Sequence, residues 1–224
     1  MISMIAALGI LIHFLGPLSS KMVVKIMRAK STPDRRLTTY ITPQRSYDGL
    51  TIVGASICCG AFSQELFVEF SNSKNVFGIL FFFLLGVLLP SVLWKVKNKV
   101  IVFKGRYVVN VDSIVFLPLT ALSEELIWRF VLPVLLLTNF WESVAVSICI
   151  SSIGFVLLHI PLGSAKSTAY MSLFTLITVI SYFAFGILAA IAFHVSHNLF
   201  IHFFHPLKVK EFKTKPPVLS ETDW

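Results

Sequence analysis

The sequence predicts an all-α fold, a polytopic membrane helix bundle with about seven transmembrane helices. Composition is the first indication, because 56% of the 224 residues are hydrophobic and only 13% are charged. Soluble domains contain roughly 25% charged residues, and the mean hydropathy of this chain is high, at +0.82. The second indication is a series of apolar segments long enough to cross ~30 Å of hydrocarbon. A soluble protein with an unusually apolar core is therefore disfavoured.

Polar flanks divide the apolar sequence into seven candidate spans. The first lacks the basic region and the small-residue cleavage site of a signal peptide, so we expect it to be retained. The fourth is long, and we expect it to tilt or to extend beyond the bilayer. In chain order the spans are 2–18, 49–70, 76–94, 111–137, 143–160, 168–185 and 187–204.

The distribution of basic residues predicts the orientation of the bundle. Lysines and arginines gather in the first loop, in the loop after residue 94 and in the C-terminal tail. Because positive loops stay in the cytoplasm, the N-terminus is predicted to be outside and the C-terminus cytoplasmic. The formal charge of +8 therefore indicates contact with anionic membrane lipid and no nucleic-acid partner. We expect an integral, multi-pass protein of the cell (plasma) membrane.

The boundary between the last two spans follows from the same rule. Residues 168–204 contain no charged residue and no obvious loop, so they could form one very long helix. A single crossing would place the lysine-rich tail outside, whereas two crossings keep it inside. We therefore predict a break around 181–186, where Gly186 can accept a tight turn. The predicted organisation is a transmembrane scaffold over 1–110, a catalytic core over 111–204 and a basic cytoplasmic tail over 205–224.

Two adjacent glutamates and an arginine lie within the fourth apolar stretch. An ionisable group at bilayer depth costs at least ~2.5 kcal/mol, so Glu124, Glu125 and Arg129 need a reason to be there. Glu125 and Arg129 are four residues apart and can meet on one helix face. Glu124 points about 100° away around the helix and is free to face another partner.

Two further apolar segments carry polar residues at the same spacing. Phe155 and His159 share one helix face, and His194 and Asn198 share another. A lone membrane histidine is usually a packing residue, but the three segments together bring a carboxylate, two imidazoles and a carboxamide. A carboxylate shielded from bulk water can act as a general base, and an imidazole opposite it can orient the water. An imidazole and an amide can stabilise an oxyanion, so the set favours hydrolysis.

The three motifs together resemble the signature of the CAAX protease and bacteriocin-processing family, also called CPBP or Abi, over about 111–204. Members are intramembrane endopeptidases, and the resemblance implies that Glu124 activates water with help from His159. It implies that Glu125 and Arg129 support Glu124, with Phe155 as a further supporting residue. It implies His194 and Asn198 as the oxyanion-stabilising pair. The implied substrate is a membrane-associated or lipidated peptide, and no cofactor is implied. One departure is that 170–193 lacks the polar loop that usually precedes the third motif.

Three other functions remain open from the sequence. A zinc-dependent intramembrane protease could use His159, His194 and Glu124 as ligands, although no His-Glu-x-x-His motif is present and Asn198 is a poor zinc ligand. A non-catalytic immunity or partner-binding protein would keep the fold without the chemistry. A proton-coupled transporter would use the same residues as a relay, but its usual inverted repeat is not evident.

Overall fold

The computed structural model describes residues 2–29, 42–73, 75–104, 111–140, 143–159 and 165–208. Most of the predicted tail over 205–224, and the basic residues within 30–41 and 105–110, lie outside these ranges. The helices are α1 (Ile2–Ala29), α3 (Pro43–Ala61), α4 (Ser63–Asn72), α5 (Val76–Val96), α6 (Val111–Glu125), α7 (Leu132–Asn139), α8 (Val144–His159), α9 (Ala165–Phe185) and α10 (Ile187–Phe203). A π-helical segment, η2 (Leu126–Val131), joins α6 to α7, and two strands are present, β1 (Lys99–Phe103) and β2 (Phe204–Lys208).

The predicted all-α membrane bundle is confirmed, with one small sheet added. The strands β1 and β2 pair antiparallel, with Ile101 opposite Pro206, and they extend the ends of α5 and α10. Three described helical stretches are long and apolar enough to cross a membrane, namely Ile2–Met27, Val76–Val96 and Thr168–Phe185. The helices α8 and α10 are apolar but shorter. The number of crossings and the orientation therefore stay predictions.

The second predicted span, 49–70, is not one straight helix. The chain bends by 95° between α3 and α4, so the two helices form a broken span or a re-entrant loop. At the bend the backbone N–H of Phe62 still donates to the Cys58 carbonyl at 3.0 Å, which ends α3 without leaving that donor unpaired. The sequence pattern missed the bend because the break, at Phe62, contains neither proline nor glycine, although α4 carries Glu65 and Glu69.

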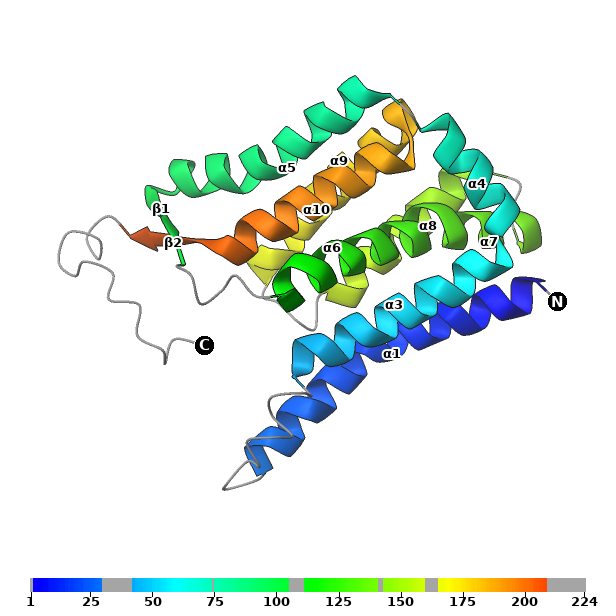
Figure 1. The fold of residues 1–224 in the computed structure, drawn as a ribbon, viewed down its shortest axis with the longest axis horizontal. Helices are drawn as coiled ribbons and strands as arrows, with labels where there is room; N and C mark the ends of the chain where they lie inside the picture. Colours follow the sequence, from blue (N-terminus) through cyan, green and yellow to red (C-terminus); the bar gives the residue numbers. More distant parts are fainter. Residues whose placement is uncertain are drawn as a thin grey trace.

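The helices α6 and α10 occupy the middle of the bundle. Figure 1 shows α1 and α3 as a pair on one side of α6, with α5 beyond α10 on the other. The closest packing is between α1 and α3 and between α5 and α10, and α6 contacts both α3 and α10. Residues from several of these helices share one apolar core that includes Ala6, Phe82, Ile127, Phe155 and Phe193. Polar groups on α6 and α10 are thereby placed far from bulk water.

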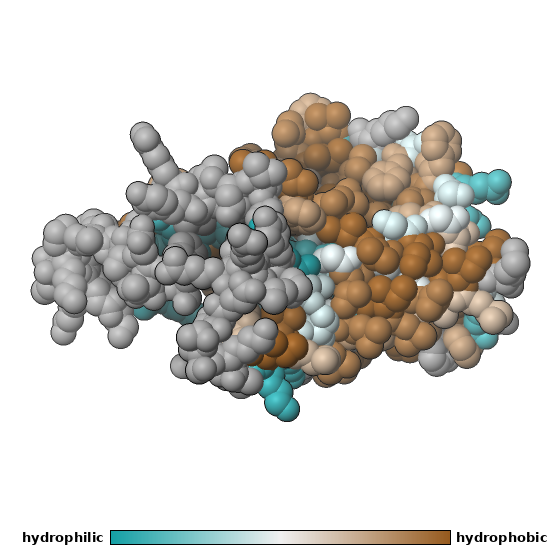
Figure 2. Space-filling model, turned by 60° about the horizontal axis from the view of Figure 1, so that its bottom comes forward, coloured by the Kyte–Doolittle hydropathy of each residue, from teal (hydrophilic) through white to brown (hydrophobic). Residues whose placement is uncertain are grey.

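The outer surface is apolar, as a lipid-facing surface must be. Large hydrophobic side chains are exposed along the helices, among them Leu11 on α1, Phe77 and Leu84 on α5, Ile153 on α8 and Ile180 on α9. Figure 2 shows one face of the molecule that is mainly hydrophobic, with the hydrophilic residues mostly towards its edges. Such a continuous apolar surface on a monomeric soluble protein would be unusual.

The predicted break between the last two spans is present at Gly186. This residue has φ +82°, a left-handed conformation that glycine adopts at little cost. The Ser73 hydroxyl accepts from the Ile187 N–H at 3.0 Å and donates to the Glu69 carbonyl at 2.8 Å. A Cβ at position 186 would lie 2.2 Å from Ser73 Oγ. A serine from α4 therefore caps α10, so the reversal needs no polar loop of its own.

Glycine also lets α5 approach α10 behind its histidines. A Cβ at Gly86 would lie 2.4 Å from the Phe193 carbonyl oxygen and 3.0 Å from the His197 backbone nitrogen. The two helices are thus in backbone contact at this level. Because interiors pack closely, this contact fixes the height and rotation of the α10 segment that carries His194.

Candidate active site

Four charged or ionisable side chains form a buried cluster between α6 and α10. Their exposed fractions are 4% for Glu124, 0% for Glu125, 1% for Arg129 and 3% for His194. The two acids end α6, the arginine lies in η2 and the histidine lies in the middle of α10. Buried charges are costly unless they are paired, and each member of this cluster has a partner.

The His194 imidazole lies between the two carboxylates. Its Nδ1 is 2.7 Å from Glu125 Oε1, and its Nε2 is 3.4 Å from Glu124 Oε2. Carboxylate oxygens only accept hydrogen bonds. Both contacts are therefore satisfied when both ring nitrogens of His194 carry protons. The imidazole beside Glu124 thus belongs to the third motif, whereas the resemblance implied a partnership with His159.

Arg129 holds the second carboxylate and is itself held by α9. Its Nε is 3.4 Å from Glu125 Oε2, so the ion pair predicted from the four-residue spacing is present. Its Nε and Nη2 also donate to the Thr178 hydroxyl at 3.2 and 2.8 Å. The guanidinium carbon lies 5.0 Å from the centre of the Phe155 ring, within range of a cation–π contact. Phe155, predicted as a supporting residue, therefore stacks against the arginine.

A π-helical turn follows directly after the glutamates. Pro133 lacks a backbone donor, and its ring would crowd the carbonyl four residues earlier, which favours widening of the preceding turn. The Leu132 N–H accordingly donates to the Ile127 carbonyl, five residues back. The Trp128 carbonyl, freed by this shift, accepts from the Ser151 hydroxyl of α8. The widened turn ties α6 to α8 beside the acids.

His159 and Asn198 lie at the edge of the cluster and are half-buried. No hydrogen bond between described residues joins either of them to Glu124. His159 Nδ1 donates to the Phe155 carbonyl at 2.8 Å, which leaves Nε2 as the acceptor of the neutral ring. Asn198 Oδ1 lies 3.3 Å from His197 Nδ1. The predicted residues thus fall into a central group on α6 and α10 and two flanking residues.

Sequence reasoning missed three contacts from the N-terminal helices. The Tyr47 hydroxyl of α3 donates to Glu124 Oε1 at 2.5 Å. The Trp128 indole donates to His13 Nε2 at 2.9 Å, and His13 Nδ1 faces the Thr51 hydroxyl at 3.0 Å. No pattern pointed to Tyr47, because it precedes the predicted start of the second span. His13 was visible only as an isolated polar residue in the first span.

His197 was also missed, and it occupies the end of the site nearest Asn198. It is 3% exposed, and the Tyr170 hydroxyl of α9 donates to its Nε2. With Nε2 accepting, Nδ1 carries the proton and donates to Asn198 Oδ1. This orients the Asn198 amide so that its NH₂ group is free of His197.

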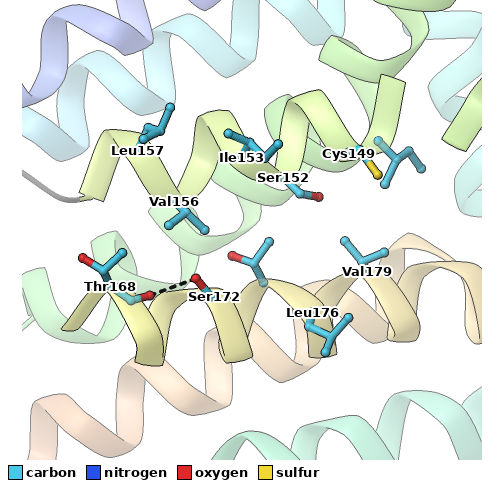
Figure 3. Close-up of a pocket in the computed structure, with 11 residues that line it drawn as sticks. Cys149, Ser152, Ile153, Val156, Leu157, Thr168, Ser172, Leu176 and Val179 are labelled. Carbon is cyan, nitrogen blue, oxygen red and sulfur yellow. Dashed lines mark hydrogen bonds between the residues drawn. The ribbon is translucent and has the colours of Figure 1, made fainter. Parts of the chain in front are cut away.

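An apolar groove runs between α8 and α9, outside the cluster. Its volume is about 450 Å³, and its walls include Ile153, Val156 and Leu176, with the hydroxyls of Ser152 and Thr175. Figure 3 shows α8 and α9 facing each other across this space, with side chains from both helices lining it. Phe174, next to Thr175, has its ring centre 4.8 Å from that of His194. Thr175, which lines the groove, and Phe174, whose ring contacts His194, are thus neighbours on α9.

A comparison with protein families identifies the C-terminal half. The family described as type II CAAX prenyl endopeptidase Rce1-like matches residues 108–200, somewhat less than half of the chain. Over this segment the chain is similar to the type II CAAX prenyl endopeptidases. The matched segment contains every site residue named from the sequence, from Glu124 to Asn198. No curated protein and no solved structure matches the chain.

The matched segment does not offer the predicted zinc ligands in a suitable arrangement. In the part of the chain that the structure describes, no three His, Cys, Asp or Glu side chains are placed to hold a metal ion. His194, one of the three ligands considered, has both ring nitrogens directed at carboxylates. These residues therefore do not fit zinc in this arrangement.

Proposed function

We propose that this protein is an intramembrane endopeptidase of the CAAX protease family that hydrolyses a peptide bond in a membrane-associated or lipidated peptide. The observation that carries the proposal is the Glu124 carboxylate, buried in an apolar bundle with His194 3.4 Å from one of its oxygens. A buried carboxylate beside an imidazole is an arrangement suited to taking a proton from water.

In the proposed reaction Glu124 is the general base. It accepts a proton from water while the water oxygen attacks the carbonyl carbon of the substrate. The Nε2–H of His194 and the amide of Asn198 stabilise the oxyanion that forms. The C–N bond then breaks, the proton passes from Glu124 to the leaving amine, and a carboxylate and an amine are released. His159 assists by orienting the water through its unprotonated Nε2.

Glu125 and Arg129 are proposed to support His194. Glu125 Oε1 accepts from His194 Nδ1 at 2.7 Å, and the arginine compensates the charge of that carboxylate from the other side. The pair therefore fixes the orientation of the His194 ring, so that its Nε2 faces Glu124.

The substrate is proposed to approach from the lipid phase. The groove between α8 and α9 is lined mainly by apolar side chains, and its lining residue Thr175 is next to Phe174, whose ring centre lies 4.8 Å from that of His194. Moving an apolar chain from the membrane into an equally apolar groove gains little free energy by itself. Binding there therefore also requires contacts between the peptide and the protein. The hydroxyl oxygens of Ser152 and Thr175, two of the lining residues, are buried and have no hydrogen-bond partner among the described residues.

The test is a cleavage assay with purified protein in lipid vesicles. Farnesylated and unmodified versions of one C-terminal peptide are compared for wild type, Glu124→Gln and the exposed control Glu65→Gln. Loss of a general base typically costs about 10²–10⁴-fold in rate, so Glu124→Gln should lose that much and Glu65→Gln should match wild type.

Two other results would contradict the proposal. Full activity in Glu124→Gln, or no cleavage by a correctly inserted wild type of any membrane-bound peptide, would favour a non-catalytic immunity or partner-binding protein. Loss of cleavage with a chelator and recovery with Zn²⁺ would favour the zinc-dependent alternative.

A further inference from the structure

The N-terminal helices contact the proposed active site through three buried hydrogen bonds. Tyr47 reaches Glu124, Asp48 accepts from the Thr120 hydroxyl of α6 at 3.0 Å, and His13 accepts from Trp128. All three N-terminal residues lie outside 108–200, the segment that matches the family. The proposed active site is therefore bounded on one side by helices that the family match does not cover.

Tyr47 is the member of this set that touches the proposed base. Its exposed fraction is 8%, and its ring packs against α1, where a Cβ at Gly16 would lie 2.9 Å from the ring carbon Cδ2. Its position is thus determined by the packing of α1 against α3. From there its hydroxyl donates to Glu124 Oε1 at 2.5 Å, while Oε2 of the same carboxylate faces His194.

A glutamate side chain has three rotatable bonds, and contacts on both of its oxygens restrict them all. We propose that Tyr47 is a positioning residue, whose hydroxyl holds Glu124 Oε1 so that Oε2 is directed at His194 and at the attacking water. This inference rests on the proposed function of Glu124 as the base. It makes α3 part of the catalytic apparatus and assigns it a role beyond that of a scaffold.

A purely structural role for the Tyr47 hydroxyl, in docking α3 against α6, can be separated from the proposed role in positioning Glu124. Asp48, the next residue, joins α3 to α6 through Thr120 and also accepts from Gln44 at 2.8 Å. Thr120→Val removes a bond between the same two helices without touching Glu124. It is the matched control for any effect that arises from looser docking of α3.

The experiment measures kcat, KM and thermal unfolding for Tyr47→Phe in the vesicle cleavage assay. Hydrogen bonds to charged groups are worth enough to change a rate by about 10- to 100-fold. We expect kcat to fall by about that factor with KM within about twofold of wild type. Tyr182→Phe, which removes the hydroxyl of another half-buried tyrosine, should keep the wild-type kcat. Substitution of Tyr47 by 4-aminophenylalanine, which restores a donor, should recover most of the loss.

Several results would overturn the inference. A wild-type kcat in Tyr47→Phe, or a rise in KM alone, would show that the hydroxyl does not position the base. An equal loss of kcat in Thr120→Val would assign the effect to docking of α3. If Glu124→Gln is inactive while Tyr47→Phe is fully active, the proposed function stands and only this inference fails. If Glu124→Gln is active, the proposed function fails first.

Discussion

The two halves of the bundle contribute to one buried site in different ways. The C-terminal helices α6 and α10 carry their polar residues at helical spacing, and these residues pair mainly with one another, as Glu125 does with Arg129 and His194. The N-terminal helices α1 and α3 contribute His13, Tyr47 and Asp48, each of which bonds across the interface. The difference supports our proposal that the chemistry lies in the C-terminal half and that the N-terminal half orients it.

Breaking the charge pairing in the C-terminal half should have the largest effect on stability. Arg129→Met leaves Glu125 buried without its cation. Removing one partner of a buried ion pair costs about 3–5 kcal/mol, and we expect a loss of that size here. Unfolding by SDS in mixed micelles measures this free energy. Lys95→Met, at an exposed site, is the control and should be close to neutral. A loss below about 1 kcal/mol for Arg129→Met would contradict the pairing.

Separating α5 from α10 tests whether the site depends on helix position. Gly86→Ala inserts a Cβ 2.4 Å from the Phe193 carbonyl oxygen, so α5 must move away. Overpacking of this kind costs about 1–3 kcal/mol, and cleavage should fall because His194 shifts with α10. Gly60→Ala, where a Cβ meets nothing within 4 Å, should change neither the unfolding free energy nor the cleavage rate. Wild-type activity in a destabilised Gly86→Ala would show that the site tolerates movement of α10.

The bond between Trp128 and His13 joins the two halves directly. Trp128→Phe keeps an aromatic ring but leaves the buried His13 nitrogen without its donor. An unsatisfied buried group costs about 1–3 kcal/mol, so the unfolding free energy should fall by that amount. His13→Phe alone should also destabilise, and the double variant should lose less than the sum of the two. Strict additivity would mean that the bond does not couple the halves.

The smallest expected effect is at the turn between α9 and α10. Ser73→Ala removes the acceptor of the Ile187 N–H, and loss of a helix cap costs about 1 kcal/mol. Ser56→Ala, whose exposed hydroxyl bonds only to its own helix at the Ile52 carbonyl, should be nearly neutral. Equal unfolding free energies for these two variants would show that the cap contributes nothing to the stability of α10.

The membrane orientation predicted from the basic loops can also be tested. In Figure 1 the end of α1, the start of α3 and the strands β1 and β2 lie towards one end of the bundle, and the start of α1 lies towards the other. This arrangement supports our proposal of an external N-terminus, a cytoplasmic tail over 205–224 and a scaffold over 1–110. Single cysteines at positions 2 and 208, tested with an impermeant thiol reagent in intact cells, should react at position 2 only. The reverse pattern would contradict the charge rule for this chain.

Much of the fold followed from local properties of the sequence. Apolar length predicted the helices, three of which in the described residues are long and apolar enough to cross a membrane. The break between the last two was predicted around 181–186 because glycine can accept a tight turn. The Glu125–Arg129 pair followed from helical spacing, which brings residues four apart together whatever the tertiary structure. The bend between α3 and α4 and the π-helical turn after Glu125 were not predicted, since each depends on how the backbone is accommodated by neighbouring helices.

The same distinction between local and tertiary properties applies to the proposed active site. The sequence alone determined which residues are ionisable at bilayer depth and which of them share a helix face, because both are properties of one helix. Only the tertiary structure decided that His194 lies between Glu124 and Glu125, that His159 bonds to its own helix, and that Tyr47 reaches the proposed base. These contacts join residues between 69 and 77 positions apart, or depend on the rotation of one helix against another. Such rotations are set by packing over whole helix faces, as at Gly86 and Gly16, and no short sequence pattern records them.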